Sequence, residues 1–475
     1  MTEYIIQPRL NTAVGAAANN RVLAMGEKGY ETDTKRWKTG DGATNWNDLG
    51  YDDDPEKIAG STSTGRAVLT GDAAEGRTAL GAVPQTAATA VLFGTSQEAR
   101  AGAGVDNIVD SVTTWDVTTR GWWNWFASYS GHCLNLVHNA GVNGNTSTQM
   151  LARIDDDVIA HNPGWVFIGG PANDAPTGIT TATTIANYTA IYEALRGRAK
   201  IVQLTMPPRT ENDTTGEKTA YGEVNAWLVD APTIFPHVET VDIAGLVADP
   251  STGGPLADTL FDTVHYTEAT ANKIGYKVYQ SIKGRLPSRP RHRLTIGHPA
   301  NALSDPGMQS TVFTAPDVTT STFTYVNDDE TMGRRCRLVI TGNTGGTQQH
   351  FVRCVENTSA GRWVPGSKVR AQMRVKFTDL QPVDLTTARR FHPILTMWTR
   401  HVDNTSYVTT DQALGLSSAE ANKQIRGLPT SGEVVLRTPW RIIPANIDRI
   451  YIDAGWLGAV SGTIEMWEPV LEKEV

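Results

Sequence analysis

Four short polar motifs in the middle of the chain contain the residue types that nucleophilic acyl transfer requires. A serine hydroxyl becomes a strong nucleophile when a neighbouring histidine accepts its proton, and that histidine needs a carboxylate to fix its tautomer. Ser111 is the candidate nucleophile and His265 the candidate base. Asp262, three residues before the histidine, can reach back to the imidazole. These residue types predict catalysis through an acyl-enzyme.

The same chemistry needs fixed hydrogen-bond donors for the negative oxygen of the tetrahedral intermediate. We expect the backbone N–H groups of Ser111 and Gly144 and the side-chain amide of Asn173 to supply them. Glycine allows close backbone approach, and a short amide is a well-placed donor. Trp115, near the nucleophile, and Asn143, beside the glycine, are expected to contact substrate. Each residue alone is more often a turn, cap or surface residue, but together they favour catalysis.

Alternating strands and helices must position these motifs. Apolar runs at 134–137, 165–168 and 200–205 predict strands. The stretches 146–162 and 181 to about 197 predict helices between them. We place Val109-Asp110-Ser111 after the first strand of this region. Such alternation predicts a doubly wound α/β domain over about 106–287, with a parallel sheet and helices on both faces. The motifs then meet at the carboxyl ends of its strands, where such sheets carry their sites.

The set resembles the SGNH (GDSL-type) hydrolases, a family named for its Ser, Gly, Asn and His. Val109-Asp110-Ser111 resembles the nucleophile block and Asn143-Gly144-Asn145-Thr146 the glycine block. Pro171-Ala172-Asn173-Asp174 resembles the asparagine block, and Asp262 with His265 the final Asp-x-x-His. The resemblance implies a serine ester hydrolase, with a carbohydrate O-acetylesterase as one form of that activity.

Two positions depart from the family pattern. Val109 and Pro171 stand where the family usually has glycine. These departures favour an alternative, in which a degenerate α/β domain belongs to a non-catalytic glycan-binding adhesin or a structural fibre subunit.

Composition divides the rest of the chain into flanking regions. Short polar and aromatic runs between glycines predict a small β-rich module of antiparallel strands at the N-terminus. Next comes an Ala/Gly-rich connector, in which Val68-Leu69-x-Gly71 and its following pattern recur 23 residues later at Val91-Leu92-x-Gly94. This recurrence indicates either stacking units or a flexible linker. Regularly spaced short strands near the C-terminus predict an antiparallel β-sandwich of jelly-roll type that could bind glycan. The four flanking ranges are 1–54, 55–105, a linker at 288–298, and 299–475.

Charge and hydropathy exclude several classes of protein. The 475 residues are 40% hydrophobic and 19% charged, enough to bury a core, and the net charge of −8 lacks the basic footprint of a nucleic-acid binder. No apolar run reaches roughly 18 residues, and the start of the chain lacks a signal-peptide pattern, so we expect no membrane insertion. No HExxH motif, paired Cys/His cluster or phosphate-binding Gly-Lys loop occurs, so we expect neither a metal nor another cofactor.

A second resemblance concerns residues 22–51, which look like the N-terminal attachment module of phage tail-fibre and receptor-binding proteins. It implies a virion protein, made in the host cytoplasm, that assembles as a homotrimer on the tail or baseplate. Its partner would be a bacterial surface glycan, from which the hydrolase removes O-acetyl or other short acyl groups. The resemblance rests on one run, Gly26-Glu27-x-Gly29-x-Glu31-Thr32-Asp33-Thr34-x-Arg36-x-Lys38-x-Gly40-Asp41-Gly42-x-x-x-Trp46-x-x-Leu49.

Overall fold

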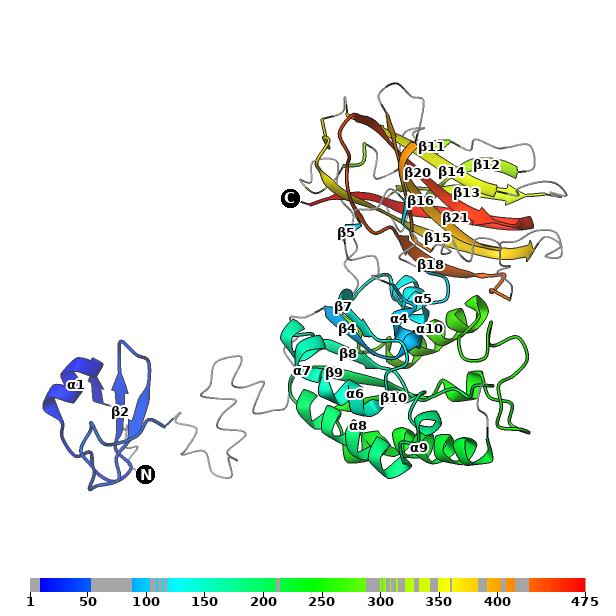
Figure 1. Ribbon diagram of the computed structural model, residues 1–475. Coiled ribbons are helices and arrows are strands. Elements are labelled where there is room, and N and C mark those ends of the chain that lie inside the picture. Colours follow the sequence, from blue (N-terminus) through cyan, green and yellow to red (C-terminus); the bar gives the residue numbers. More distant parts are fainter. Residues whose placement is uncertain are drawn as a thin grey trace, which may run out of the picture. The chain divides into compact units, whose positions relative to one another are not determined.

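The chain forms two compact units, residues 1–84 and 85–475, in a computed structural model (Figure 1). Each unit is described by itself. Among the described residues, no helix combines the length and the apolar character needed to cross a membrane. The described residues are 9–52, 88–102, 108–109, 113–114, 118–210, 214–287, 300, 302–304, 308, 313–314, 321–328, 333–341, 349–358, 361–382, 391–401, 403, 407–414 and 427–474.

The N-terminal unit contains a three-stranded sheet and one helix. Strand β1 (Arg9–Asn11) pairs parallel with β2 (Lys28–Glu31), and β2 pairs antiparallel with β3 (Trp37–Thr39). Helix α1 (Ala13–Asn19) corrects our prediction of antiparallel strands alone. Its alanines favour helix, and the Thr12 side chain caps it by accepting the Gly15 N–H. A small core of Ala16, Leu23, Trp46 and Leu49 closes the unit.

A five-stranded parallel sheet lies at the centre of the second unit, in the order β10-β9-β8-β4-β7. The predicted strands at 165–168 and 200–205 are confirmed, and the run at 134–137 belongs to a longer strand that continues to Gly141. The bounds are β4 Thr89–Gly94, β7 Asn135–Gly141, β8 Trp165–Ile168, β9 Lys200–Leu204 and β10 Val238–Val241.

Helices cover both faces of this sheet, as predicted. Alternate strand residues point to opposite faces, so Leu92 and Phe167 belong to one hydrophobic cluster and Val91 and Phe93 to another. Helices α5 and α10 pack in the first cluster; α6, α7, α8 and α9 pack in the second. The predicted helix at 146–162 is broken into three short pieces, α6, α7 and η2, whereas the one beginning at Thr181 is continuous. The bounds are α4 Ser96–Ala99, α5 Trp122–Ser130, α6 Ser147–Ala152, α7 Ile154–Asp157, η2 Ile159–His161, η3 Ala175–Thr177, α8 Thr181–Leu195, α9 Thr215–Ile234, η4 Ala244–Leu246 and α10 Glu268–Ile282.

The sheet corrects the predicted boundary between connector and α/β domain. Strand β4 and helix α4 fall within 55–105, which we assigned to the connector, yet β4 is hydrogen-bonded to both β7 and β8 inside the sheet. The reason is burial: Ala90 to Phe93 are completely inaccessible to solvent, as expected of a central parallel strand. The second copy of the recurring pattern is therefore part of the α/β domain, and the first copy lies outside the described residues.

Two sheets, largely antiparallel, form the C-terminal region, and buried side chains of both share one hydrophobic cluster. Their orders are β11-β14-β20-β16-β17-β6 and β12-β13-β21-β15-β19-β5, with β18 pairing β15. The jelly-roll topology stays a prediction. The bounds are β11 Phe313–Thr314, β12 Ser321–Asp328, β13 Gly333–Ile340, β14 Gln349–Asn357, β15 Lys368–Pro382, β16 His392–His401, β17 Tyr407–Gln412, β18 Gly432–Arg437, β19 Trp440–Ile442, β20 Ile447–Leu457 and β21 Ala459–Lys473.

Two very short strands join these C-terminal sheets from the α/β part of the sequence. Strand β5 (Ile108–Val109) pairs parallel with β19, and β6 (Thr113–Thr114) pairs parallel with β17. Val109 is thus in a C-terminal sheet, which corrects our prediction that Val109-Asp110-Ser111 directly follows the first strand of the α/β sheet. The linker at 288–298 lies outside the described residues.

Candidate active site

A serine, a histidine and an aspartate are connected by two successive hydrogen bonds beyond the carboxyl ends of the parallel strands. Nε2 of His265 is 2.9 Å from Oγ of Ser96, and Nδ1 of His265 is 2.8 Å from Oδ2 of Asp262. The second carboxylate oxygen, Oδ1, accepts the backbone N–H groups of Val264 and His265 at 2.8 and 2.7 Å. This is the connectivity of a nucleophile, a general base and an orienting carboxylate.

The predicted pairing of Asp262 with His265 is therefore present, and among the described residues the serine that lies within hydrogen-bonding distance of this histidine is Ser96. Ser111 lies outside the described residues. The described residues on either side of it, Val109 and Thr113, belong to strands of the C-terminal sheets. The first α/β strand is β4, and Ser96 follows its last residue, Gly94, by two positions. We therefore assign the nucleophile position to Ser96.

Ser96 begins the short helix α4 and is half-buried, between the buried Thr95 and the buried Gln97 and Glu98. The Glu98 carboxylate accepts the backbone N–H of Thr95 at 2.9 Å and the indole N–H of Trp122 at 3.3 Å. Glu98 is 2% exposed, and a side chain added at Gly94 or Gly169 would collide with its carboxylate. Burial raises the pKa of Glu98 to about 7, against the opposing effect of those two hydrogen bonds. The buried carboxylate of Glu98 therefore holds the backbone on the N-terminal side of Ser96 through its hydrogen bond to Thr95.

The histidine loop is more exposed and is held by polar contacts. The side chains of His265 and Asp262 are 20% and 39% exposed. Partial burial acts to raise the pKa of Asp262, but hydrogen bonds from His265 and from the Val264 N–H outweigh it, so the pKa lies below its usual value. Gln97, beside the serine, donates its amide to the carbonyl of Val264 at 2.8 Å and links the two segments directly.

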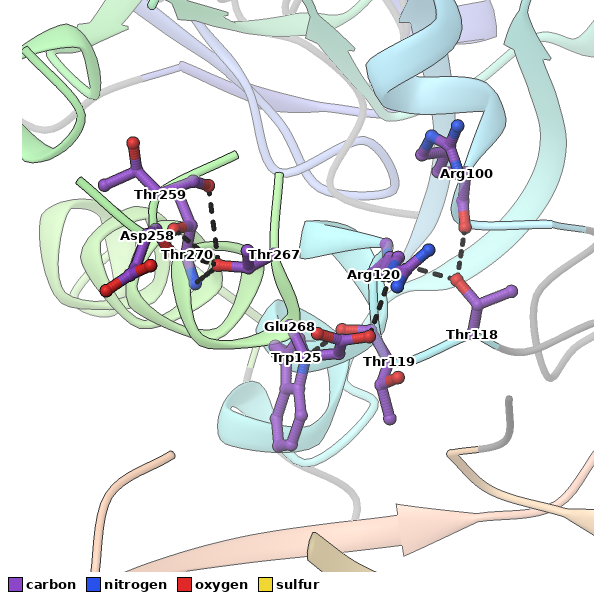
Figure 2. A network of polar contacts seen from close by, with 11 residues as sticks. Arg100, Thr118, Thr119, Arg120, Trp125, Asp258, Thr259, Thr267, Glu268 and Thr270 are labelled. Atoms are coloured by element: carbon purple, nitrogen blue, oxygen red, sulfur yellow. Dashed lines mark hydrogen bonds and ion pairs between the residues drawn. The ribbon is translucent and has the colours of Figure 1, made fainter. Parts of the chain in front are cut away.

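Behind the histidine, an aromatic and cationic stack leads into the start of α10. The Phe261 ring is nearly parallel to the His265 ring at 5.9 Å, and the Arg120 guanidinium lies 3.8 Å from the Phe261 centroid. Arg120 in turn donates to Glu268 at 2.8 Å, in an ion pair that is almost fully buried (Figure 2). This ion pair therefore holds the first residue of α10, directly after the histidine loop.

Figure 2 shows further hydrogen bonds around the Arg120–Glu268 pair. Thr118 donates its hydroxyl to the Arg100 carbonyl at 2.7 Å, and the Trp125 indole donates to the Thr119 carbonyl at 2.7 Å. On the α10 side, the Thr267 hydroxyl lies 3.0 Å from that of Thr270 and caps the helix. These contacts fix the backbone on which the histidine loop rests.

Two of the three predicted oxyanion donors, Gly144 and Asn173, follow the strands that flank β4, and the third, Ser111, lies outside the described residues. Gly144 lies on an exposed turn after β7, with φ of +76°, a conformation that strongly favours glycine. Asn173 follows β8 and donates one amide hydrogen to the Asn145 carbonyl at 2.8 Å, which leaves its second hydrogen available. Within the described residues, no acceptor is bonded to the backbone N–H of Ser96 or Gly144. Gly144 and Asn173 thus follow strands that neighbour β4 in the sheet, and their role as oxyanion donors stays a prediction.

Arg153 holds the glycine turn against the nucleophile strand. Its guanidinium donates to the carbonyls of Gly94 at 2.8 Å and Ala140 at 2.7 Å, and to the Asn145 side chain at 2.8 Å. One cation therefore joins the ends of β4 and β7 to the residue that follows Gly144. Sequence reasoning missed Arg153, because an arginine within a helical stretch carries no motif.

The remaining predicted site residues are less informative. Asn143 is exposed beside Gly144, and Trp115 lies outside the described residues. The described ranges contain no group of three or more His, Cys, Asp or Glu side chains placed to hold a metal ion.

A signal for Ser96 exists in the sequence. Gly94-Thr95-Ser96 follows the buried run Val91-Leu92-Phe93 and differs from Gly-Asp-Ser by one residue. Two features hide this signal: Thr95 replaces the aspartate of the family motif, and the segment that begins at Val91 repeats the pattern of residues 68–81, which suggests a connector.

Comparison with known proteins gives matches to one enzyme family and its structures. The sequence profile of the GDSL-like lipase/acylhydrolase family matches residues 101–272, which include Asp262 and His265 and begin five residues after Ser96. No curated protein sequence matches the chain.

Among solved structures, the chain is similar to a lipase/acylhydrolase from Enterococcus faecalis at 22% identity and a TM-score of 0.32, covering 42% of this chain and 97% of that one. A GDSL-like lipase from Bacteroides thetaiotaomicron has 18% identity and a TM-score of 0.33, covering 42% and 89%. A catalytic mutant of an acetylxylan esterase from Geobacillus stearothermophilus has 20% identity and a TM-score of 0.32, covering 41% and 93%. The profile match and the geometry around His265 together support a GDSL-like lipase/acylhydrolase domain in this chain.

Proposed function

We propose that the chain is a serine esterase in which Ser96 is the nucleophile, His265 the general base and Asp262 the group that orients the base. One observation carries the proposal: the imidazole of His265 lies within hydrogen-bonding distance of the serine on one side and the carboxylate on the other. A neutral imidazole that donates Nδ1–H to Asp262 presents an unprotonated Nε2 to the serine hydroxyl.

In the first half-reaction, Ser96 Oγ attacks the ester carbonyl and its proton passes to Nε2 of His265. The negative oxygen is stabilised by the N–H groups of Ser96 and Gly144 and by the Asn173 amide. Collapse of this intermediate breaks the bond to the alcohol, which leaves with the proton from His265. Water, deprotonated by the same imidazole, then hydrolyses the acyl-enzyme and releases the acid.

Hydrolysis of p-nitrophenyl acetate by matched serine variants tests this assignment. We expect Ser96→Ala to lower kcat by about 10⁴-fold or more, because no other group can take the acyl chain. Ser111→Ala is the control and should stay within about threefold of the parent, a spread that corresponds to less than about 1 kcal/mol. The opposite pattern, a large loss in Ser111→Ala alone, would return the nucleophile to Ser111.

The adhesin alternative loses one of its two supports with this assignment. Val109 no longer occupies the position of the family glycine, since Gly94 precedes Thr95-Ser96. Pro171 remains a departure. We therefore favour the esterase.

We also propose the setting that the N-terminal resemblance implies: a phage tail-fibre or tailspike protein that removes O-acetyl or other short acyl groups from a host surface glycan. The support is the residue pattern of 22–51, which falls in a unit that folds around its own small core. The homotrimer is checked by native mass spectrometry of the full chain, where a monomer at micromolar concentration would contradict it. Release of acetate from purified host polysaccharide tests the substrate.

A further inference from the structure

A cavity of about 670 Å³ lies where helices α5 and α10 face strands β15 and β18, inside the second unit. This volume is in the range of small-molecule sites, roughly 300–1,000 Å³. Next to Val435, which lines the cavity, the His132 imidazole lies 3.0 Å from the carbonyl of that valine and connects the end of α5 to β18. None of the residues assigned to the esterase lines the cavity.

Three tyrosines supply its aromatic surface. Tyr129 of α5 meets Tyr276 edge to face at 5.0 Å, and it lies nearly parallel to Tyr279 at 6.4 Å. Tyr276 is 47% exposed, which is unusual for a large aromatic side chain that already has ring partners. Tyrosine offers an apolar face and a polar edge, a combination suited to ligands with both C–H faces and hydroxyl groups.

A buried amide provides hydrogen-bonding capacity at the same place. Asn272, only 3% exposed, donates to the phenol oxygen of Tyr129 at 2.9 Å. Among the described residues, neither the Asn272 carbonyl oxygen nor the Tyr129 hydroxyl hydrogen has a partner. Burial raises the pKa of Tyr129 to about 12, so the phenol keeps that hydrogen at neutral pH. One acceptor and one donor therefore remain for a ligand.

The charges that line the cavity are mostly compensated. Arg374 is 2.9 Å from Glu468 and is also paired with Glu433, so this cation is already neutralised. Lys273 is exposed and lies on α10 three residues before Tyr276. A site with compensated charge, aromatic faces and free amide and hydroxyl groups suits an uncharged, hydroxyl-rich ligand better than an ion.

We propose that this cavity binds a segment of neutral oligosaccharide at a site separate from the catalytic serine. The pyranose rings would pack on Tyr276 and Tyr279, and their hydroxyls would bond to Asn272 and Tyr129. Lys273 lies about 9 Å along α10 from Thr267, the residue that caps this helix two positions after His265. A bound glycan chain would thus be held on the helix that follows the histidine loop. The site goes beyond the proposed esterase and does not depend on it.

Saturation-transfer NMR on the full chain carrying Ser96→Ala tests the proposal without turnover. The probes are neutral xylo-, manno-, cello- and malto-oligosaccharides, with oligogalacturonate as an acidic comparison. We expect transfer to at least one neutral probe and about tenfold weaker binding in Tyr276→Ala, because one ring face is worth roughly a factor of ten. The exposure of Tyr276 means that its removal leaves no core cavity.

Lys277→Ala is the matched control, since Lys277 is exposed on the same helix outside the cavity; it should bind as the parent does. Tyr129→Phe, which keeps the ring and loses the hydroxyl, should weaken binding a few-fold. Absence of transfer to every neutral probe, binding of oligogalacturonate alone, or equal losses in Tyr276→Ala and Lys277→Ala would each overturn the proposal. Binding is measured here without turnover, whereas the esterase assignment is tested by hydrolysis of p-nitrophenyl acetate in Ser96→Ala and Ser111→Ala, so failure of either proposal is seen separately.

Discussion

The two segments that meet at the active site are built in opposite ways. The serine turn, residues 94–100, is packed around the buried Glu98. The histidine loop, residues 258–267, leaves a fifth of the His265 side chain and more than a third of the Asp262 side chain exposed. Burial positions the nucleophile, whereas hydrogen bonds and ion pairs position the base. Substitution of the buried Glu98 in the serine turn should therefore affect stability, and substitution of Asp262 in the histidine loop should affect mainly catalysis.

The largest effect that separates the two segments is expected for Asp262→Asn. An amide can donate to Nδ1 and so favour the tautomer that protonates Nε2, which can no longer accept the serine proton. We expect kcat for p-nitrophenyl acetate to fall by roughly 10³–10⁴-fold. Because the side chain is 39% exposed, the free energy of unfolding should change by less than about 1 kcal/mol.

Asp249→Asn is the matched control, since that aspartate holds an exposed turn through Ser251 and has no hydrogen bond to His265 among the described residues; kcat should stay at the parent value. If Asp262→Asn lowered the free energy of unfolding by several kcal/mol and left kcat nearly unchanged, the contrast between the two segments would be reversed.

A smaller, pH-dependent effect is expected for Glu98→Gln. The pKa of Glu98 rises from 4.5 to about 7 on folding, so between these values the folded chain holds a proton that the unfolded chain releases. The stability of the parent therefore declines as pH rises through this window, by about 3 kcal/mol in all. Glutamine does not titrate, so this part of the decline should be absent from the variant.

Denaturant unfolding of both proteins from pH 4.5 to 8 measures the difference, in which the other titrating groups cancel. A constant difference across that range would mean that Glu98 is ionised in the folded chain at all these pH values.

The smallest effect is expected at Gln97, which joins the two segments. Gln97→Ala removes the hydrogen bond to the Val264 carbonyl, worth about 1 kcal/mol, and should lower kcat about fivefold. The midpoint of the pH–rate profile should stay in place, since the Asp262–His265 pair is untouched. A shifted midpoint would show that Gln97 acts on the protonation of His265 and not on the alignment of the loop.

The same contrast explains which parts of the site the sequence could predict. Asp262 and His265 are three residues apart, and their contact is local, so a motif captures it. Strands such as 165–168 are apolar on both faces and are recognised by composition alone. Ser96 is 169 residues from His265, and its contact with the imidazole depends on the order of strands in the sheet. Gly94-Thr95-Ser96 and Val109-Asp110-Ser111 both resemble the motif, and the evidence that favours the first is three-dimensional: the pairing of β4 with β7 and β8 and the contact of Ser96 with His265.

The sequence pattern also does not predict helix α1 or the breaks after α6 and α7. In α1, the turn-type residues around it obscured a short alanine-rich run. In the stretch 146–162, the spacing of Met150, Ile154 and Val158 fits one helix, and all three are indeed buried in one cluster. The backbone nevertheless changes direction at Arg153, whose φ of −114° is not helical and whose side chain binds the strand ends.

The short strands β5 and β6 connect the α/β part of the second unit to its C-terminal sheets through backbone pairing. Just after the nucleophile helix, the chain contributes one strand to each C-terminal sheet before it returns to α5. Shortening the gene at the linker near residue 288 would remove the partners of both strands and leave unpaired backbone within twenty residues of Ser96. A graft of the α/β domain onto another scaffold would therefore need to retain the C-terminal sheets to keep these two strands paired.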